Sequence, residues 1–362
     1  MLVRSVSVQG FRNLKDDTII LNDGINILCG DNAQGKTNIL EAIYFCSMGR
    51  SHRIKQDSRL INFDSKEAHI RVFTEKEKLT DRIDVHLRKD EKKGIAVNGI
   101  PIKRLNELLG TFYTVIFSPE DLSLIKNAPS ERRRFIDMEL CQLSNVYYYD
   151  LQQYYKVLKQ RNNLLKRLIK EPSLKDTVFI WDNQLVDFGK RIIRERMDFC
   201  KKLEEFASEN HRLITGGNEK LKIEYKPNCD IENFEEKLVS SLERDIFTGS
   251  TNYGPHKDDM SFFVNGSDVR IFGSQGQQRT AALSMKLAEI DIIKSETGVT
   301  PVMLLDDVLS ELDEKRQNFL LDMTSDIQSV ITCTGIEDSI KKFTGKANVM
   351  SVKNGETKPI KI

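Results

Sequence analysis

The sequence predicts an α/β protein in which mixed β-sheets with flanking helices are interrupted by an inserted, coiled-coil-like helical arm. Short β-branched runs bounded by Gly, Asn or Asp fill the first third of the chain. Apolar residues then recur at alternating spacings of four and three, the coiled-coil pattern. Strand-like runs return after Gly216. Together these observations indicate one β-rich frame, divided by helices in its middle.

The composition narrows the class of protein. The 362 residues are 39% hydrophobic and 30% charged, which suits one large or two ordinary domains. We see neither a long apolar run nor a signal peptide, so we expect a cytoplasmic protein with no membrane partner. The six cysteines are dispersed without a CxxC pair, which favours reduced thiols over a zinc site. The net charge is +1, so any nucleic-acid surface must be a local patch.

The outer parts of the chain are expected to form strands around a few helices. A helix should run from Lys36 to about Met48, and the stretch 69–102 alternates apolar and polar residues in several pieces. Further helices should follow the turn near residue 274 and the acidic strand at 301–307. The expected strands are 3–10, 16–22, 24–30, 111–117, 221–226, 260–264, 268–272, 301–307 and 329–334.

Almost every residue from about Arg132 to His211 fits a helix. Two apolar seams are separated by a break at 171–173, so the helices should fold back as an antiparallel hairpin. An ordinary helical subdomain is the alternative, and the length of the seams favours an arm. The first seam is Leu151, Tyr155, Leu158, Asn162, Leu165 and Ile169, and the second is Trp181, Leu185, Phe188, Ile192, Phe199, Leu203 and Phe206.

The segment GDNAQGKT, between an expected strand and an expected helix, matches the phosphate-binding loop G-x-x-x-x-G-K-[ST]. Its glycines let backbone N–H groups turn toward phosphate oxygens, and the helix N-terminus adds positive potential. Lys36 should contact the β- and γ-phosphates, and the Thr37 hydroxyl should bind Mg²⁺. The expected nucleotide-binding residues are Gly30, Asp31, Asn32, Ala33, Gln34, Gly35, Lys36 and Thr37.

A second acidic element follows far downstream, where the apolar strand 301–305 ends in two aspartates. Asp306 is expected to complete the Mg²⁺ shell with Thr37. Asp307 is expected to orient or deprotonate the attacking water, with Lys36 as the other catalytic residue. Two acidic residues after a strand are weak evidence for a nucleotide-hydrolysing site when they occur alone. In a chain that also has a phosphate-binding loop, they are strong evidence for one.

A Ser-Gly-Gln turn at 274–278 opens a helix between these two elements. This order of motifs resembles the ABC-type ATPases and, within their SMC-like branch, the RecF family of recombination proteins. The segments that carry the resemblance are FRN (11–13), GDNAQGKTNILEAIY (30–44), GRSHR (49–53), FSPEDL (117–122), SERRRFID (130–137), GPHKDD (254–259), SQGQQRT (274–280) and LLDDVLSELD (304–313).

The resemblance implies an ATPase head whose signature motif begins at Ser274. It implies that Ser274, Gly276 and Gln277 bind the γ-phosphate held by a second copy, giving a homodimer closed by ATP and Mg²⁺, with Ser310 and Asp313 also at the interface. The alternative for the 274–278 segment is a glycine turn that only caps the following helix and binds no phosphate. The implied lobes are 1–118 with 297–362, and 119–296 with the arm at about 132–212.

The chain departs from many ABC-type ATPases in three places, the first being that the usual Q-loop Gln is not evident and that Glu120 and Asp121 follow the corresponding strand instead. Asp307 stands where they carry a longer Glu, so we expect weak, slow ATP hydrolysis that acts as a timer. The switch His after the last core strand is absent, and Thr332 and Thr334 stand there instead.

Clusters of basic residues indicate where the protein could bind DNA. Such residues would contact the phosphates and would not recognise the base sequence. For the basic residues of the arm, the alternative to DNA binding is that they form an ordinary solvent-exposed helix face. Arg50 and Arg53, after the phosphate-loop helix, could contact DNA or the nucleotide. The candidate DNA-binding residues are Arg132, Arg133, Arg134, Lys156, Lys159 and Arg161.

The resemblance implies a role in recombinational DNA repair, replication-fork maintenance and the SOS response. It implies binding to gapped or single-strand–double-strand junction DNA, and action with RecR and RecO to load RecA. The alternative is an ABC-type ATPase that acts as a structural or nuclease-coupled DNA factor. We expect no nuclease activity, because too few residues follow the segment 309–313 for an acidic nuclease domain.

Overall fold

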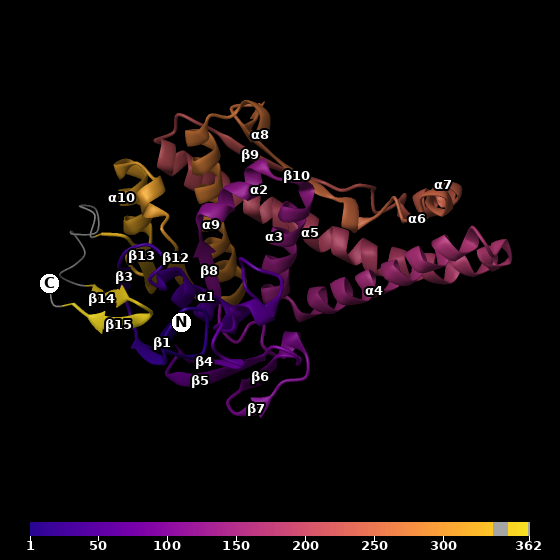
Figure 1. Ribbon diagram of the computed structural model, residues 1–362. Helices are drawn as coiled ribbons and strands as arrows, with labels where there is room; N and C mark the ends of the chain where they lie inside the picture. The colour runs from indigo at the N-terminus through magenta and orange to yellow at the C-terminus, as the bar shows by residue number, and fades with distance from the viewer. Residues whose placement is uncertain (336–346, 361–362) are drawn as a thin grey trace. The chain divides into compact units, whose positions relative to one another are not determined.

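A computed structural model describes residues 1–335 and 347–360. The chain divides into two compact units, shown in Figure 1: unit 1 comprises residues 1–121 and 289–362, and unit 2 comprises residues 122–288. The lobes expected from the sequence have boundaries close to these.

Unit 1 contains two six-stranded sheets. The antiparallel sheet has the order β2-β1-β4-β5-β6-β7, from β1 (Leu2–Gln9), β2 (Asp17–Ile20), β4 (Glu67–Lys76), β5 (Leu79–Arg88), β6 (Gly94–Val97) and β7 (Ile100–Pro101). The second has the order β15-β14-β3-β13-β12-β8, from β3 (Ile25–Cys29), β8 (Thr114–Phe117), β12 (Val302–Leu305), β13 (Ser329–Cys333), β14 (Asn348–Lys353) and β15 (Glu356–Pro359). Its strands are parallel except for β15, so the sheet is mixed, as predicted.

Helix α1 (Lys36–Met48) contacts strands of both sheets. Eleven of its thirteen residues are buried, as expected for a helix that is apolar on all sides. The central strands β3, β13 and β12 and the edge strand β8 are buried along their whole length, which is typical of strands covered on both faces. Other helical segments of unit 1 in the described residues are η1 (Asp57–Leu60), η2 (Leu105–Glu107), η3 (Pro119–Asp121), η6 (Leu309–Glu311), α10 (Glu314–Met323) and the end of α9 (Gln275–Thr297).

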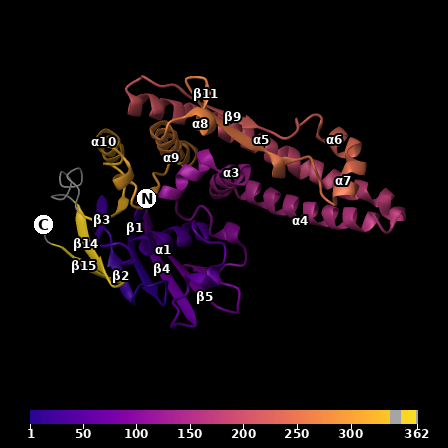
Figure 2. The ribbon, with the colours of Figure 1, turned by 45° about the horizontal axis from the view of Figure 1, so that its top comes forward.

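The predicted arm is confirmed in unit 2. Helices α4 (Asn145–Leu168) and α5 (Val178–Thr215) form an antiparallel hairpin, and the break between them is η4 (Pro172–Thr177). Figures 1 and 2 both show the two helices side by side. The predicted seam of α4 is partly wrong, because Tyr155 is 42% and Ile169 64% exposed. The buried face includes Tyr154, Arg161 and Leu168 instead, since ion pairs make a charged residue acceptable in the interior.

The rest of unit 2 packs along the hairpin. Helix α3 contacts β10, and α5 contacts β9 in a three-stranded antiparallel sheet of order β11-β10-β9. These elements are α2 (Leu122–Lys126), α3 (Pro129–Leu143), β9 (Leu221–Lys226), α6 (Phe234–Ser240), α7 (Leu242–Thr248), η5 (Pro255–Lys257), β10 (Asp259–Val264), β11 (Ser267–Asp268), α8 (Val269–Phe272) and the start of α9 (Gln275–Thr297).

The strand expected at 268–272 is wrong. The segment forms the short helix α8, because the Asp268 side chain caps it by accepting a hydrogen bond from the Arg270 backbone N–H at 2.8 Å. Only Val269 is buried, whereas Ile271 and Phe272 are exposed. No helix among the residues that the structure describes has the length and apolar character needed to span a membrane.

Candidate nucleotide site

The predicted site residues of unit 1 meet at the carboxyl edge of the mixed sheet. Strand β3 ends at Cys29, immediately before Gly30, and β12 ends at Leu305, immediately before Asp306. Strand β13 lies between them and pairs in parallel with both. Ligands of open α/β sheets bind beyond this edge, so the topology joins two motifs that are far apart in the sequence.

The phosphate loop ends at the N-terminus of α1. Gly35 precedes the helix with φ 112°, a conformation that glycine permits, and no side chain caps this end. The first N–H groups of a helix have no intrahelical partner, so they remain for an anion. Asp31, Asn32 and Ala33 are exposed on the loop.

The base of the loop is fixed to strand β14 and the turn after it. The Gln34 side-chain oxygen accepts from the Asn354 backbone N–H at 2.6 Å, and its carbonyl accepts from the Gly355 N–H at 3.0 Å. A side chain at Gly30 would place its Cβ only 2.2 Å from the Val352 carbonyl oxygen. Gly30 is therefore required for close packing of the loop on the sheet.

The Lys36 ammonium lies within the loop. Its Nζ donates to the carbonyl oxygens of Gly30, at 2.7 Å, and Asp31, at 3.0 Å, and the residue is 4% exposed. The loop thus holds a cation among its own carbonyls, next to the exposed helix N-terminus.

Thr37 and Asp306 are in direct contact. The Thr37 hydroxyl donates to Asp306 Oδ1 at 2.7 Å, and the Thr332 hydroxyl donates to the same oxygen at 3.1 Å. Burial raises the pKa of Asp306, and these two hydrogen bonds oppose that rise. Adjacent oxygens of an octahedral Mg²⁺ shell are about 2.9 Å apart, so the Thr37 hydroxyl and the Asp306 carboxylate fit this ion in chemistry and spacing.

Asp307 is held in an unusual backbone conformation, with φ 51°. Its N–H donates to the Thr332 hydroxyl at 2.8 Å, and its carbonyl accepts from the Ser310 hydroxyl at 2.7 Å. Non-glycine residues seldom adopt positive φ, and those that do cluster at functional sites. Asp307 lines the same cavity as Lys36 and Thr37.

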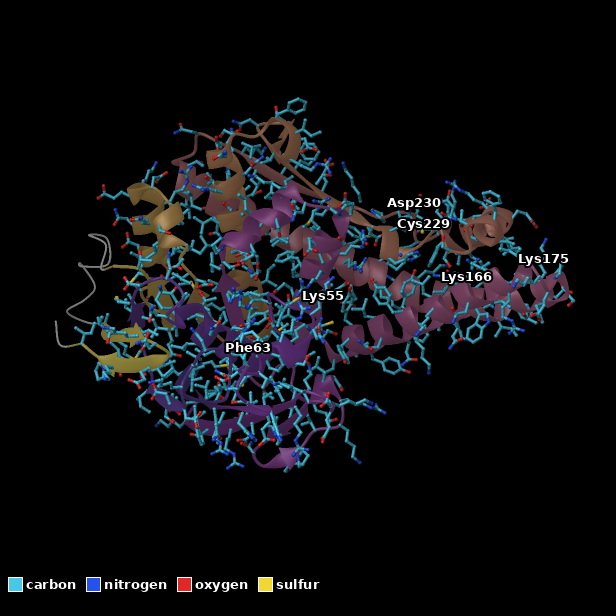
Figure 3. The ribbon with its side chains drawn as sticks, viewed as in Figure 1. Lys55, Phe63, Lys166, Lys175, Cys229 and Asp230 are labelled. Atoms are coloured by element: carbon cyan, nitrogen blue, oxygen red, sulfur yellow. The ribbon has the colours of Figure 1, made fainter. Side chains whose placement is uncertain are left out.

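That cavity, of about 550 Å³, adds residues that the sequence analysis missed. Arg53, which the basic clusters already indicated, lies in its wall with Arg59. Phe63, labelled in Figure 3, also lines it and is 100% exposed. No local sequence pattern identifies Phe63, because its exposure is set by the tertiary fold.

Three of the segments that carry the RecF resemblance, 11–13, 30–44 and 49–53, meet beneath this cavity. The Arg12 guanidinium forms a two-pronged ion pair with Glu41, at 2.9 and 3.0 Å, and the Ser51 hydroxyl donates to Glu41 as well. Glu41 is fully buried. This network therefore fixes α1 to the segments on either side of it, and it positions the loop rather than contacting a ligand.

Ser274 is the residue that caps α9 in unit 2. Its hydroxyl accepts from the Gln277 backbone N–H at 3.2 Å, while the Gln277 side-chain oxygen accepts from the Ser274 N–H at 3.0 Å. This reciprocal pair is a capping box. Ser274 remains exposed and Gly276 half-buried, so this helix start stays accessible to another molecule. Asp313 similarly caps α10 by accepting from the Arg316 N–H at 2.9 Å.

The expected DNA-binding role of Arg132 and Arg161 is wrong. Arg132 is 1% exposed and forms a two-pronged ion pair with Asp259, at 2.6 and 3.1 Å. Arg161 is fully buried and pairs with Asp182 and Asp245. Each guanidinium is committed to internal carboxylates, so neither can reach a phosphate backbone.

The other four candidates differ in accessibility. Arg133 donates to the Asp258 carbonyl at 2.7 Å, and Arg134 is half-buried. Lys156 and Lys159 are exposed on α4, on the same side as Lys166, which Figure 3 labels on the arm. The accessible positive charge on this helix therefore includes a stripe of lysines beside the exposed Arg167.

Comparisons with known proteins agree with this geometry. Residues 2–358 match the family model "RecF/RecN/SMC N terminal domain". A DNA replication and repair protein RecF from Lachnoclostridium phytofermentans is 53% identical over 340 residues, 94% of each chain. Another, from Lachnospira eligens, is 50% identical over 357 residues, 98% of each chain.

Solved structures show the same likeness. A structure described as "the recombination mediator protein RecF-ATP in RecFOR pathway" has a TM-score of 0.92 and 37% identity, covering 99% of this chain and 97% of that one. An Smc head bound to a ScpA domain has a TM-score of 0.60 at 16% identity, covering 100% and 98% of the two chains, and shows a shared fold. The resemblance seen in the sequence motifs is thus confirmed, and the chain belongs to the RecF family of SMC-like, ABC-type ATPases.

Proposed function

We propose that this chain is an ATP-dependent DNA-binding protein of recombinational repair and replication-fork maintenance. The observation that carries the proposal is the contact of Thr37 with Asp306, which unites the phosphate loop and the acidic strand beside Lys36. Family membership supports the biological setting, because the relatives are named DNA replication and repair proteins.

The roles of the residues follow from their positions. The loop N–H groups and Lys36 would hold the phosphates, and Thr37 and Asp306 would bind Mg²⁺. Bound Mg²⁺ supplies positive charge that offsets the phosphate oxygens during hydrolysis. Asp307 would accept a proton from, or orient, the attacking water. Its short side chain and constrained backbone support weak hydrolysis, suited to a timer.

The exposed start of α9 supports an ATP-dependent homodimer. Ser274, Gly276 and Gln277 would bind the γ-phosphate held by a second copy, since a helix N-terminus attracts an anion. Ile271 and Phe272, 62% and 74% exposed, adjoin this start and offer apolar surface for a partner. Ser310 and Asp313, both exposed beside the acidic strand, are proposed for the same interface.

DNA binding would depend on backbone contacts. Lys156 and Lys159 provide exposed charge, and base-reading elements are not needed for gapped or junction DNA. RecR, with RecO and indirectly RecA, are the proposed protein partners, in line with the family and with a solved relative described as part of the RecFOR pathway.

The test is fluorescence anisotropy of a labelled gapped duplex, titrated with protein, Mg²⁺ and either no nucleotide, ADP or ATP. The variants are Lys36→Ala and Ser274→Asp. Asp caps a helix about as well as Ser, so Ser274→Asp keeps the cap while adding a charge that repels phosphate. We expect tight binding with ATP only, lost in both variants, and light scattering should show that neither forms ATP-dependent dimers.

Two outcomes would contradict the proposal. If DNA binding does not depend on nucleotide and is unchanged by both substitutions, then DNA binding depends on the basic surface alone. Normal ATP-dependent dimers in Ser274→Asp would remove the start of α9 from the interface. Lys156→Gln with Lys159→Gln separates the two surfaces, because these changes should weaken DNA binding without affecting dimer formation.

A further inference from the structure

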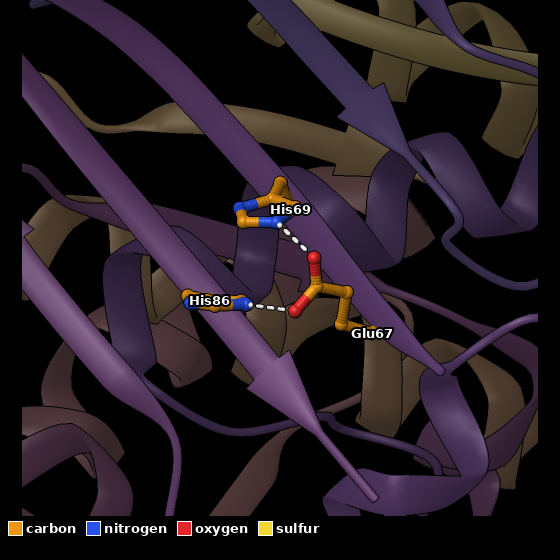
Figure 4. A group of neighbouring side chains, drawn as sticks. All are labelled: Glu67, His69 and His86. Atoms are coloured by element: carbon orange, nitrogen blue, oxygen red, sulfur yellow. Dashed lines mark hydrogen bonds and ion pairs between the residues drawn. The ribbon is translucent and has the colours of Figure 1, made fainter. Parts of the chain in front are cut away.

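The solvent-facing side of the antiparallel sheet in unit 1 holds two of the chain's five histidines. His69 on β4 and His86 on β5 are direct cross-strand partners, and Glu67 lies two residues before His69 on the same face. The imidazole rings stack, with centroids 4.0 Å apart and planes inclined by 20°. Figure 4 shows the Glu67 carboxylate reaching both rings.

The potential ligand atoms converge. Glu67 Oε2 lies 3.0 Å from His86 Nε2, and Glu67 Oε1 lies 3.5 Å from His69 Nε2. One donor atom from each of the three residues lies within 4.8 Å of the other two. In a tetrahedral zinc site, with bonds near 2.1 Å, two ligand atoms are about 3.4 Å apart. The two Glu67–His separations lie close to that edge length, and the third edge, between the two histidine nitrogens, is no longer than 4.8 Å.

The surroundings leave this group open to solvent ions. The Glu67 side chain is 50% exposed, and those of His69 and His86 are 44% and 29% exposed. Both histidines line a surface cavity of about 690 Å³, which gives water access to a fourth position. Arg88 Nε lies 3.5 Å from Glu67 Oε2 and donates to His86 Nε2 at 3.4 Å, so an ion would displace this guanidinium from both ligand atoms.

We propose that Glu67, His69 and His86 form a surface site for a divalent transition-metal ion, with Zn²⁺ as the representative ion. Two imidazoles and one carboxylate suit Zn²⁺, Co²⁺, Ni²⁺ and Cu²⁺, whereas Mg²⁺ prefers oxygen ligands. The site is distinct from Thr37 and Asp306, whose ligands are both oxygen atoms. An ion bound here would join β4 to β5 across the sheet.

The test is a Zn²⁺ titration of the full-length chain by calorimetry, in excess Mg²⁺ so that oxygen-only sites are occupied. The six cysteines are buried, so they compete little in the folded protein. We expect one saturable Zn²⁺ site, weakened more than about tenfold by His69→Gln or His86→Gln, since even changes to outer-shell partners weaken metal binding 10–100-fold.

Asp84→Asn is the matched control. Asp84 lies on the same strand as His86 and pairs with Arg71 and Arg82, at 2.6 and 2.8 Å, so the change removes a nearby carboxylate without removing a ligand. Its Zn²⁺ affinity should equal that of the wild type. Histidine NMR provides a second measurement on the unmodified chain: the signals of His69 and His86 should shift on addition of Zn²⁺, and that of His256 should not.

The proposal is overturned if the wild type shows no saturable Zn²⁺ binding, or if both histidine variants bind as tightly as the wild type. It is equally overturned if Mg²⁺ competes as well as Zn²⁺, or if the signals of His69 and His86 do not move. Glu67 would then be only a surface ion-pair partner of His69, His86 and Arg88.

Discussion

Replacing Arg161 by Met should strongly destabilise the arm. Arg161 is fully buried, with Nε donating to Asp182 Oδ1 at 2.5 Å and Nη1 donating to Asp245 Oδ2 at 2.6 Å and Thr251 Oγ1 at 3.0 Å. Met matches the stem of Arg as far as Nε and carries no charge, so it keeps the packing of the stem but leaves both carboxylates without their cation.

The magnitude follows from the burial of those carboxylates. Their side chains are 11% exposed in Asp182 and 0% in Asp245, so water cannot replace the guanidinium at either. Breaking a buried ion pair by removing one partner costs about 3–5 kcal/mol. We therefore expect the free energy of unfolding to fall by about 4 kcal/mol at pH 8.

The loss should be smaller at low pH. Burial raises the pKa of Asp182, and the Arg161 guanidinium opposes that rise. Without Arg161 the folded-state pKa rises further above the unfolded value. A raised carboxyl pKa means that the folded state binds the proton more tightly, so stability is lost as pH rises through that interval. The variant should therefore be closer to the wild type at pH 5 than at pH 8.

Urea denaturation followed by tryptophan fluorescence measures this effect locally. The chain has a single tryptophan, Trp181, which packs against the apolar cluster of α4 and α5 that includes Leu165 and Val178. Lys159→Met, at an exposed position of the same helix, is the matched control and should change stability by less than about 0.5 kcal/mol. If Arg161→Met loses no more stability than this control, the ion-pair argument fails.

Two further effects should be measurable. Burial lowers the pKa of His256 to about 4, so the unfolded chain binds a proton that the folded chain resists, and stability should fall by about 3 kcal/mol as pH drops from 6.5 to 4. His256→Gln should flatten this pH dependence of the urea midpoint, and an unchanged slope would contradict the assignment. Phe63→Ala should weaken ATP binding about tenfold in calorimetry, because base–aromatic stacking is worth about 1–3 kcal/mol. Phe63→Tyr should bind normally, and equal affinity in the Ala variant would exclude stacking.

The sequence predicts the phosphate loop and the acidic strand because each is a local pattern with its own strand or helix beside it. It also predicts that Asp306 shares a Mg²⁺ shell with Thr37, whereas the parallel pairing of β3, β13 and β12 that brings both to one edge is visible only in the fold. The exposure of Phe63 depends on how η1 and the following turn cover the sheet. No local sequence pattern predicts this arrangement.

The errors on the arm have a common physical cause. Arg161 carries the same charge as Lys156 and Lys159, and the sequence between 156 and 170 contains no acid to reveal a partner. Its partners, Asp182 and Asp245, lie on α5 and α7, so only the tertiary fold distinguishes a buried cation from a solvated one. The same limit applies to Arg132, whose partner Asp259 is 127 residues away.

The 274–278 turn can both cap helix α9 and bind the phosphate of a second copy, because a serine hydroxyl can accept and donate at the same time. Ser274 Oγ accepts from the Gln277 N–H, which uses one of its two lone pairs. The structure assigns no acceptor to its O–H among the described residues, so this donor stays available to an anion. One serine can therefore cap α9 and bind a phosphate oxygen at once. The observed cap thus does not argue against the signature role, and it orients the hydroxyl at the exposed helix start that a second copy would need to reach.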